Sequence, residues 1–299
     1  MHHVLIMIAA AGRVELDLSS VESARVEMKR SGLEIGDPVY LAPQEAVDIP
    51  FSGDPIRARA SVERILEGWP IDIAVLPAEG RRKRLLISDM DSTILQNETL
   101  DELAEEAGVG AEVAAITDRS MSGEIDFGQA LIERVAMLKG LEISALDRTA
   151  ARMVMMPGAL TLIATMRAHG AFTALVSGGF RYFTRLAASR AGFDREDAND
   201  LEIKDGHLTG RLKGTLLDRR GKRDRLESYA AEYGLDLSEC LAVGDGANDL
   251  DMIQAAGLGV GFHAKPIVAD ACLARVTHGD LTALLYLQGY RRQEFVMKV

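Results

Sequence analysis

The sequence predicts an α/β protein built on a doubly wound, mostly parallel sheet, with an inserted helical cap and a small N-terminal α+β unit. Short apolar runs alternate with segments of helical periodicity, and three of those runs end in small or acidic residues. Alternating strands and helices are typical of parallel sheets, which bind ligands at the carboxyl ends of their strands. A stretch at about 97–156 is helical nearly throughout and predicts the cap.

Length and composition limit the classes of protein to consider. The chain has 299 residues, of which 47% are hydrophobic and 26% charged, enough for one large domain or two ordinary ones. A net charge of −11 argues against a general nucleic-acid binder. The two cysteines lie in no C-x-x-C pair, and no apolar stretch approaches the length of a membrane span. We therefore expect a cytoplasmic protein with neither a nucleic-acid nor a membrane partner.

The N-terminal unit is predicted to span residues 1–80. Apolar runs predict strands at 4–10, 39–42 and 71–76, and capping residues predict helices at 19–29 and 54–66. A β-α-β-β-α-β order would suit a small ferredoxin-like sandwich. The pattern loosely resembles ACT-like modules, which bind amino acids and regulate metabolic enzymes. A packing or dimerising domain without a ligand is an equal alternative.

The second domain, predicted at 81–299, opens with an apolar strand at 85–88 that delivers Asp89 and Asp91 to its carboxyl end. Two carboxylates so close repel each other unless a cation such as Mg²⁺ shares them. A capped turn is the simpler alternative for this pair taken alone. The cap helices are expected at 98–107, 110–121, 127–138 and 144–152, where they would cover a cleft.

The α/β alternation then resumes. We expect strands at 172–176, 240–244 and 258–262, helices at 180–191, 222–233 and 250–256, and a hairpin around Asp205-Gly206. Ser177-Gly178-Gly179 is predicted to form a turn after the first of these strands, and Gly244 to Asp249 follow the second.

Polar residues at three strand ends should converge on one edge of the sheet. Asp245, with Asp89 and Asp91, would give an oxygen-rich partial shell for Mg²⁺. The hydroxyl and backbone N–H groups of Ser177-Gly178-Gly179 could cradle a phosphate, and Lys222 could add a point charge. Each group alone is commonly a turn, a cap or a solvated lysine, but packing does not explain all of them together.

These motifs resemble those of the haloacid dehalogenase superfamily of phosphohydrolases. The pattern is D-x-D-S-T, S-G-G, a lone lysine and G-D-G-A-N-D, and it covers about residues 85–280. The stretches 89–93, 97–102, 123–127, 134–135 and 176–180 further resemble the phosphoserine phosphatase family of that superfamily. The resemblance implies hydrolysis of O-phosphoserine to L-serine and phosphate, which is the last step of serine biosynthesis.

The resemblance also implies residue roles. Asp89 would be the nucleophile that forms an aspartyl-phosphate, and Asp91 the acid that protonates the leaving serine oxygen. Mg²⁺ would be held by Asp89, the backbone carbonyl of Asp91, and Asp245. The phosphoryl oxygens would be held by Ser177, Gly178 and Lys222, while Asn248 orients the site and Asp249 supports metal-bound water. In the cap, Arg134 would bind the substrate carboxylate, Glu98 would bind its ammonium, and Phe127 and Met121 would close the pocket.

Other functions stay open at this stage. A related phosphatase, or a phosphotransferase to an alcohol such as homoserine, would share the same nucleophile and metal site. A regulatory amino-acid-binding protein with a vestigial phosphatase half is disfavoured, because Asp89, Asp91, Lys222 and Asp245 are all intact. A P-type pump would need membrane spans, and the sequence has no P-loop or dinucleotide fingerprint. His263 is expected in a loop rather than as a ligand. A homodimer is compatible with the sequence, which does not fix the oligomeric state.

Overall fold

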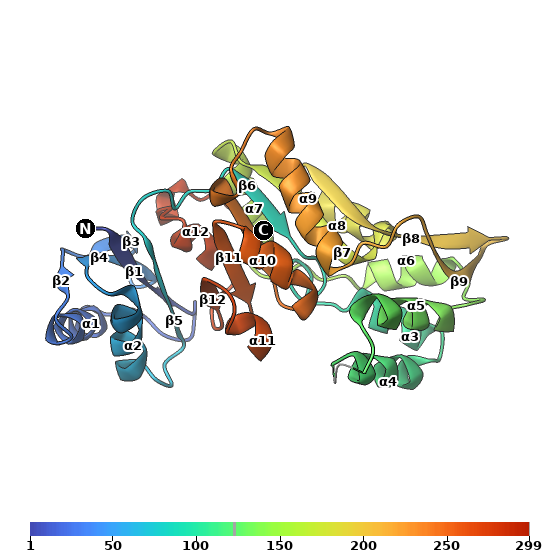
Figure 1. Cartoon of the computed structure of the whole chain (residues 1–299), viewed down its shortest axis with the longest axis horizontal. Coiled ribbons are helices and arrows are strands. Elements are labelled where there is room, and N and C mark those ends of the chain that lie inside the picture. The colour runs from blue at the N-terminus through green and yellow to red at the C-terminus, as the bar shows by residue number, and fades with distance from the viewer. Residues whose placement is uncertain (122–123, 299) are drawn as a thin grey trace.

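The computed structural model of the chain describes residues 1–121 and 124–298, without the side chain of Met121. A five-stranded sheet and a seven-stranded sheet organise the molecule. In Figure 1 the N-terminal sheet, drawn in blue, lies at one end of the molecule and the green cap helices at the other, with the large sheet between them. Among the described residues, no helix has both the length and the apolar character needed to cross a membrane.

The N-terminal unit is an antiparallel sheet with two helices on one face. Its strands are ordered β2-β4-β1-β5, with β3 also paired to β4. Along the chain the elements are β1 (His3–Ala9), α1 (Leu18–Arg30), β2 (Glu34–Ile35), β3 (Val39–Ala42), β4 (Ala46–Ser52), α2 (Pro55–Ile65) and β5 (Ile71–Pro77). Strand β4 was not singled out in the sequence, because Asp48 and Pro50 are residue types depleted from strands. Its burial explains why it forms: Val47, Ile49 and Phe51 are fully buried.

Both faces of this small sheet are buried. Leu5 and Met7 pack towards the unit's own helices, whereas Val4, Ile6 and Ile8 belong to the same apolar core as α12 (Ala283–Leu287) of the large domain. The alternation follows from the period of two along a strand.

Two buried carboxylates of the N-terminal unit bind the large domain. Asp48 pairs with Arg81, whose guanidinium also donates to the carbonyl oxygens of Tyr286 and Leu287. Asp72 accepts hydrogen bonds from the backbone N–H groups of residues 277–279, at 2.7 to 3.2 Å. The unit is therefore docked through apolar and polar contacts together.

The large sheet confirms the predicted doubly wound fold. Its order is β12-β11-β10-β6-β7-β8-β9, parallel from β12 to β8 with β9 antiparallel at the edge. The strands are β6 (Leu85–Ser88), β7 (Phe172–Phe180), β8 (Arg195–Lys204), β9 (His207–Lys213), β10 (Cys240–Gly244), β11 (Leu258–Phe262) and β12 (Ala274–Val276). Helices α7 (Ala159–Ala168) and α8 (Arg181–Ala191) pack on one face, and α9 (Arg219–Glu232) and α10 (Leu250–Ala255) on the other.

Two local predictions were wrong. Residues 177–179 do not form a turn after a strand, because β7 continues to Phe180 through a register shift against β8 between Val176 and Phe180. Helix α9 begins at Arg219 rather than at Lys222, because the Asp218 side chain caps it by accepting the Gly221 N–H. Lys222 therefore lies inside the first turn of the helix.

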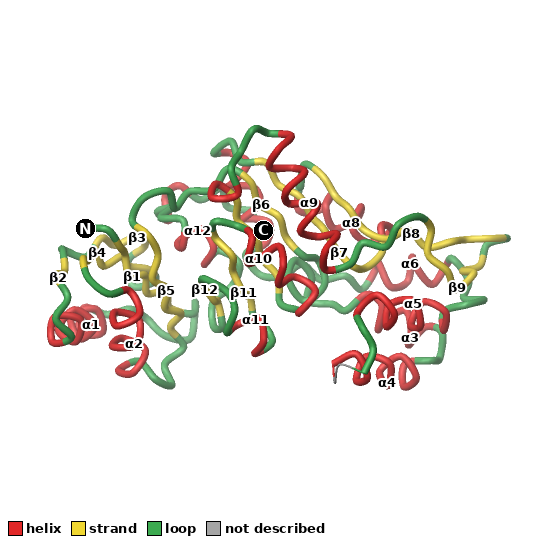
Figure 2. Tube along the Cα trace, in the orientation of Figure 1, coloured by secondary structure: helices red, strands yellow, loops and turns green. Residues whose placement is uncertain are grey.

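The cap has the four helices that the sequence predicted. They are α3 (Thr99–Glu106), α4 (Gly110–Met121), α5 (Phe127–Met137) and α6 (Ser144–Ala151). The cap leaves and rejoins the large domain as two adjacent segments, which Asn97 joins by accepting the Val154 N–H and donating to the Arg152 carbonyl. Figure 2 shows the β8–β9 hairpin reaching the cap, where Leu208 exchanges backbone hydrogen bonds with Gly140 and Leu141.

Candidate active site

The centre of the site is Asp89, immediately after β6. The four residues of β6 are buried, and the Asp89 N–H donates to the Val243 carbonyl, which continues the pairing with β10 by one residue. Its carboxylate is only 5% exposed and accepts a hydrogen bond of 2.7 Å from the Met90 N–H. The sheet thus presents a fixed, buried carboxylate at its ligand-binding edge.

The end of β10 brings two further carboxylates to Asp89. Asp249 accepts the N–H groups of Asp245 and Gly246 at 3.2 and 3.1 Å, which folds this loop back on itself. A Cβ atom at Gly244 would lie 2.3 Å from the Asp249 carboxylate, so only glycine fits there. Oxygen atoms of Asp89, Asp245 and Asp249 all lie within 4.8 Å of one another. The Asp91 side chain is not part of this cluster.

Lys222 compensates part of this negative charge. Its side chain is completely buried, and its Nζ lies 2.7 Å from Asp89 Oδ1 and 2.6 Å from Asp249 Oδ1. Burial alone would lower the pKa of Lys222, but the carboxylates of Asp249 and Asp89 outweigh burial and raise it. The two carboxylates therefore favour the charged form of the Lys222 ammonium and hold it pointing at Asp89 and Asp249.

One ammonium does not neutralise three buried carboxylates. Burial, together with the charges of Asp89 and Glu98, raises the pKa of Asp245 to about 7. Burial and the Asp89 charge raise that of Asp249 to about 8 despite Lys222. Clustered oxygen ligands with uncompensated charge suit a hard divalent cation. The cluster could therefore hold a metal ion.

The bulge in β7 forms the second wall. Ser177 is 1% exposed, and its Oγ accepts the Gly179 N–H at 2.9 Å. A Cβ at Gly178 would lie 2.9 Å from the ring of Phe127 in the cap, and one at Gly179 would lie 2.9 Å from Asp91 Oδ2. Both positions therefore require glycine, and the bare backbone leaves room for close approach of a ligand.

Asp91 lies between the sheet and the cap. Its Oδ1 accepts the Thr99 N–H at 3.0 Å at the start of α3. Burial raises the pKa of Asp91 well above its usual value, with further contributions from Glu98 and Asp89 that outweigh this hydrogen bond. A raised pKa favours the protonated carboxyl group, which is the form that can act as an acid.

The cap contributes charges of both signs. Glu98 is exposed within the cleft and accepts a hydrogen bond of 2.6 Å from Ser92 Oγ. Desolvation and the neighbours Asp101 and Asp89 raise the pKa of Glu98. Arg134 is half-buried in α5; desolvation lowers its pKa, although the charges of Asp101, Glu98 and Asp91 oppose this. Its Nε makes only a long contact, 3.4 Å, to the Ala130 carbonyl.

The remaining predicted residues are placed as follows. The Phe127 ring lies where a Cβ atom at Gly178 would approach it, so the cap residue Phe127 faces residue 178 of β7. Asn248 lies half-exposed in the 3₁₀ turn Ala247–Asp249, next to Gly246. The Met121 side chain, which was predicted to help close the pocket, lies outside the described residues. His263 is in a loop as expected, with a φ of 44°, and its Nε2 is 2.9 Å from the Gly279 carbonyl oxygen.

Two residues near the site were not assigned roles from sequence. The Lys265 N–H donates to the Asp245 carbonyl. The Lys265 ammonium partly offsets the rise in the pKa of Asp245 and of Glu98. Asn199, in β8, bonds to the backbone of Gly178. Neither lies in a motif that the sequence analysis recognised, although Lys265 follows β11 as Asp245 follows β10.

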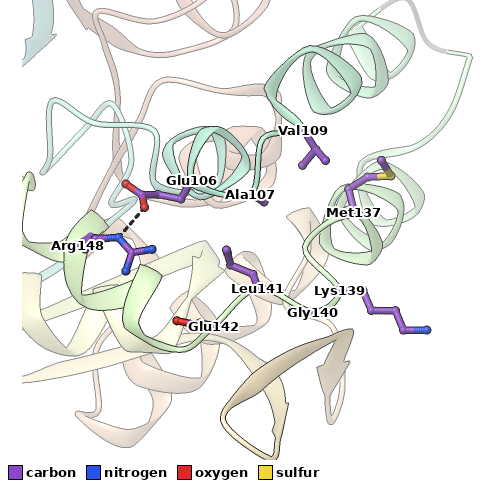
Figure 3. Close-up of a pocket in the computed structure, with 9 residues that line it drawn as sticks. All are labelled: Glu106, Ala107, Val109, Met137, Lys139, Gly140, Leu141, Glu142 and Arg148. Carbon is purple, nitrogen blue, oxygen red and sulfur yellow. Dashed lines mark hydrogen bonds and ion pairs between the residues drawn. The ribbon is translucent and has the colours of Figure 1, made fainter.

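One pocket of the described residues lies away from the acidic cluster. It has a volume of about 440 Å³ and lies within the cap (Figure 3). Its lining includes an ion pair between Glu106 and Arg148 but none of the predicted site residues. The convergent polar groups of the candidate site therefore lie at the sheet edge, outside this pocket.

Comparison with known proteins agrees with this geometry. The model of the haloacid dehalogenase-like hydrolases matches residues 86–254, which is more than half of the chain. The chain belongs to this family of hydrolases. Within the family it is similar to phosphoserine phosphatases. The Streptomyces coelicolor phosphoserine phosphatase is 44% identical over 257 residues, covering 84% of this chain and 62% of that protein.

Solved structures give the same relationship. A probable phosphoserine phosphatase from Vibrio cholerae superimposes with a TM-score of 0.79 and 32% identity, over 98% of this chain and 88% of that one. A phospho-aspartyl intermediate analogue of phosphoserine phosphatase gives 0.65 and 40% identity, over 69% and 98%. The chain spans only about three fifths of the length of the Streptomyces protein.

Proposed function

We propose that the chain is a Mg²⁺-dependent phosphoserine phosphatase that converts O-phosphoserine to L-serine and phosphate in the last step of serine biosynthesis. The observation that carries the proposal is the contact of Asp89 Oδ1 with the buried Lys222 ammonium beside Asp245 and Asp249. That arrangement fixes a nucleophilic oxygen at a site able to neutralise a phosphate. The comparisons support the substrate, since the similar proteins carry that name.

The proposed reaction has two steps. Asp89 attacks phosphorus in line, forming the Asp89 oxygen–phosphorus bond as the bond from phosphorus to the serine oxygen breaks. Asp91, protonated as its raised pKa favours, gives its proton to that oxygen. Water then attacks the phosphorus, and Asp91 takes a proton from that water. The bond between phosphorus and the Asp89 oxygen breaks, which frees phosphate and restores the Asp89 carboxylate.

The charges of the phosphoryl group need fixed partners during both steps. Lys222, the Ser177 hydroxyl and the Gly178 N–H are the groups of this chain proposed to hold its oxygens, and Asn248 orients the site. Asp89, Asp245 and the Asp91 carbonyl, with the help of Asp249, would hold a Mg²⁺ ion, which would supply the positive charge that allows a carboxylate to approach a phosphate. The choice of Mg²⁺ over other divalent cations is part of the proposal.

Substrate choice is assigned to the cap. Phosphoserine carries a carboxylate and an ammonium beyond its phosphate, and Arg134 and Glu98 are the proposed partners of these two groups. Within the described part of the chain, Arg134 Nε makes the 3.4 Å contact to the Ala130 carbonyl, and the guanidinium feels the charges of Asp101, Glu98 and Asp91 while remaining available to a substrate carboxylate. Phe127, with Met121, would exclude water when the cap closes.

The decisive experiment measures phosphate release from O-phospho-L-serine, phosphothreonine and p-nitrophenyl phosphate, with and without Mg²⁺. We expect strong Mg²⁺-dependent preference for phosphoserine and loss of all activity in Asp89→Asn. Activity on the aryl phosphate alone would retain the mechanism and reject the substrate. Substantial phosphate release by Asp89→Asn would reject the covalent step. Formation of phosphorylated homoserine, with release of serine, when homoserine is added would favour a phosphotransferase.

Four further expectations remain proposals. The chain is proposed to divide into an N-terminal unit at 1–80 and a phosphatase domain at 81–299, with the cap inserted at about 97–156. Binding of an amino acid by the N-terminal unit, as in ACT-like modules, is a prediction that ligand titration would test. A homodimer and a cytoplasmic location are likewise predictions, for which light scattering and cell fractionation are the measurements.

A further inference from the structure

Asn199 is a buried residue next to the site, and both the nitrogen and the oxygen of its side-chain amide make hydrogen bonds. It lies in β8, where it pairs with Phe180 just beyond the bulge in β7, and it is 3% exposed. Its Nδ2 donates to the carbonyls of Gly178 at 2.9 Å and Leu217 at 3.3 Å, and its Oδ1 accepts the Leu217 N–H at 2.8 Å. Buried amides are retained where every bond can be made, and such bonds fix the groups that they join.

The bond to Gly178 orients the phosphate cradle. The peptide unit between Gly178 and Gly179 is held at both ends, by Asn199 at its carbonyl and by Ser177 Oγ at its N–H. Because Ser177 Oγ accepts that N–H, its own hydroxyl hydrogen is directed elsewhere and can be donated to a phosphoryl oxygen. These two hydrogen bonds also restrain the preceding peptide unit. Its Gly178 N–H is, after the Ser177 hydroxyl, the second group proposed to donate to a phosphoryl oxygen.

The bonds to Leu217 orient the lysine. Leu217 directly precedes Asp218, the N-cap of α9, and the Lys222 N–H donates to the Asp218 carbonyl. Holding both the N–H and the carbonyl of Leu217 therefore fixes where α9 starts and where Lys222 enters the site. In the described residues no direct hydrogen bond joins segment 177–179 to segment 217–222, so Asn199 is the polar link between them.

We propose that Asn199 is a positioning residue for phosphate binding, which holds the Ser177–Gly179 cradle and the Lys222 helix start at a fixed spacing. The inference rests on the proposed function in taking the bound group to be a phosphoryl group. Asn199 itself touches neither the acidic cluster nor the reacting atoms. A shift of the cradle relative to the lysine would weaken binding of every phosphoryl ligand, whatever its leaving group.

Asn199→Asp is the sharpest variant. It keeps the shape and the acceptor for the Leu217 N–H but replaces the donor by an oxygen that faces two carbonyls. Asn199→Ala removes all three bonds without adding charge. Gln288→Ala is the matched control, because Gln288 is an equally buried amide, 1% exposed, that bonds to Lys83 and Leu284 away from the site.

The measurements are the affinity for inorganic phosphate in the presence of Mg²⁺, kcat and KM on O-phospho-L-serine and p-nitrophenyl phosphate, and the Tm. We expect Asn199→Asp to weaken phosphate binding and to lower kcat/KM on both substrates by the same factor, about 10²-fold. Gln288→Ala should lower the Tm and leave phosphate affinity unchanged. Wild-type phosphate affinity in Asn199→Asp, or equal weakening in Gln288→Ala, would overturn the proposal.

Two safeguards keep the test decisive. If neither Asn199 variant folds, the side-chain amide protons of Asn199 in the wild-type protein are followed by NMR; a shift on adding inorganic phosphate supports the link, and none overturns it. If the wild type hydrolyses p-nitrophenyl phosphate but not phosphoserine, the proposed substrate fails. The phosphate affinities still decide the role of Asn199, because they do not depend on the substrate.

Discussion

Removal of the metal should make the stability of the protein strongly dependent on pH. Without a cation, burial and neighbouring charge hold the pKa of Asp245 at about 7, against 3.8 as its usual value. Between these values the folded state binds more protons than the unfolded state, so the free energy of unfolding falls as pH rises. For Asp245 alone, the full difference corresponds to at most roughly 4 kcal/mol.

Bound Mg²⁺ should cancel most of this dependence, because it stabilises the ionised carboxylates. The assay is urea unfolding at pH 5, 6, 7 and 8 with EDTA or with saturating Mg²⁺. We expect Mg²⁺ to add little stability at pH 5 and the most at pH 8. Equal slopes with EDTA and with Mg²⁺ would refute the reasoning, and Asp245→Asn should flatten the EDTA series.

Three substitutions give further expectations. Arg134→Ala should lower kcat/KM on phosphoserine by about 10- to 150-fold, the range for losing a hydrogen bond to a charged group, and should spare p-nitrophenyl phosphate; equal losses on both would reject the carboxylate role. Asp91→Asn should slow phosphoserine hydrolysis by about 10²- to 10⁴-fold but affect p-nitrophenyl phosphate less, since nitrophenolate leaves without a proton; comparison of the two rates tests this. Asp72→Ala should destabilise the protein by at least about 1–3 kcal/mol, because three backbone N–H groups lose their acceptor. Urea unfolding is the check, beside the control Glu63→Ala, which removes part-exposed ion pairs with Arg59 and Arg275.

The strand ends were predictable because their signal is local. Asp89 and Asp245 each follow a short apolar run, and the parallel topology then brings them together. The cap helices were equally clear, because their apolar residues recur at three- and four-residue intervals. The strand ends and the cap helices can both be predicted without knowing the order of the strands in the sheet.

The features that the sequence did not predict depend on contacts between residues that are far apart in the sequence. The bulge at residues 177–179 exists only relative to β8, and a glycine pair without that partner is indistinguishable from a turn. Asn199 is 21 and 18 residues from its two partners, and nothing in its neighbourhood marks it as buried. Strand β4 contains residues that disfavour strands and forms because β1 pairs along its length. In each case tertiary packing overrides the local pattern.

The two-sided burial of the N-terminal sheet has a consequence for how the chain comes apart. Val4, Ile6 and Ile8 share one core with Tyr286 and Leu287, so separating the sheet would expose apolar surface on both partners. A fragment cut near residue 80 would carry that exposed face on either side of the cut, and self-association of both pieces is the expected fate. Calorimetry of the intact chain should accordingly record a single cooperative melting event, and limited proteolysis should find the linker protected until the whole molecule opens.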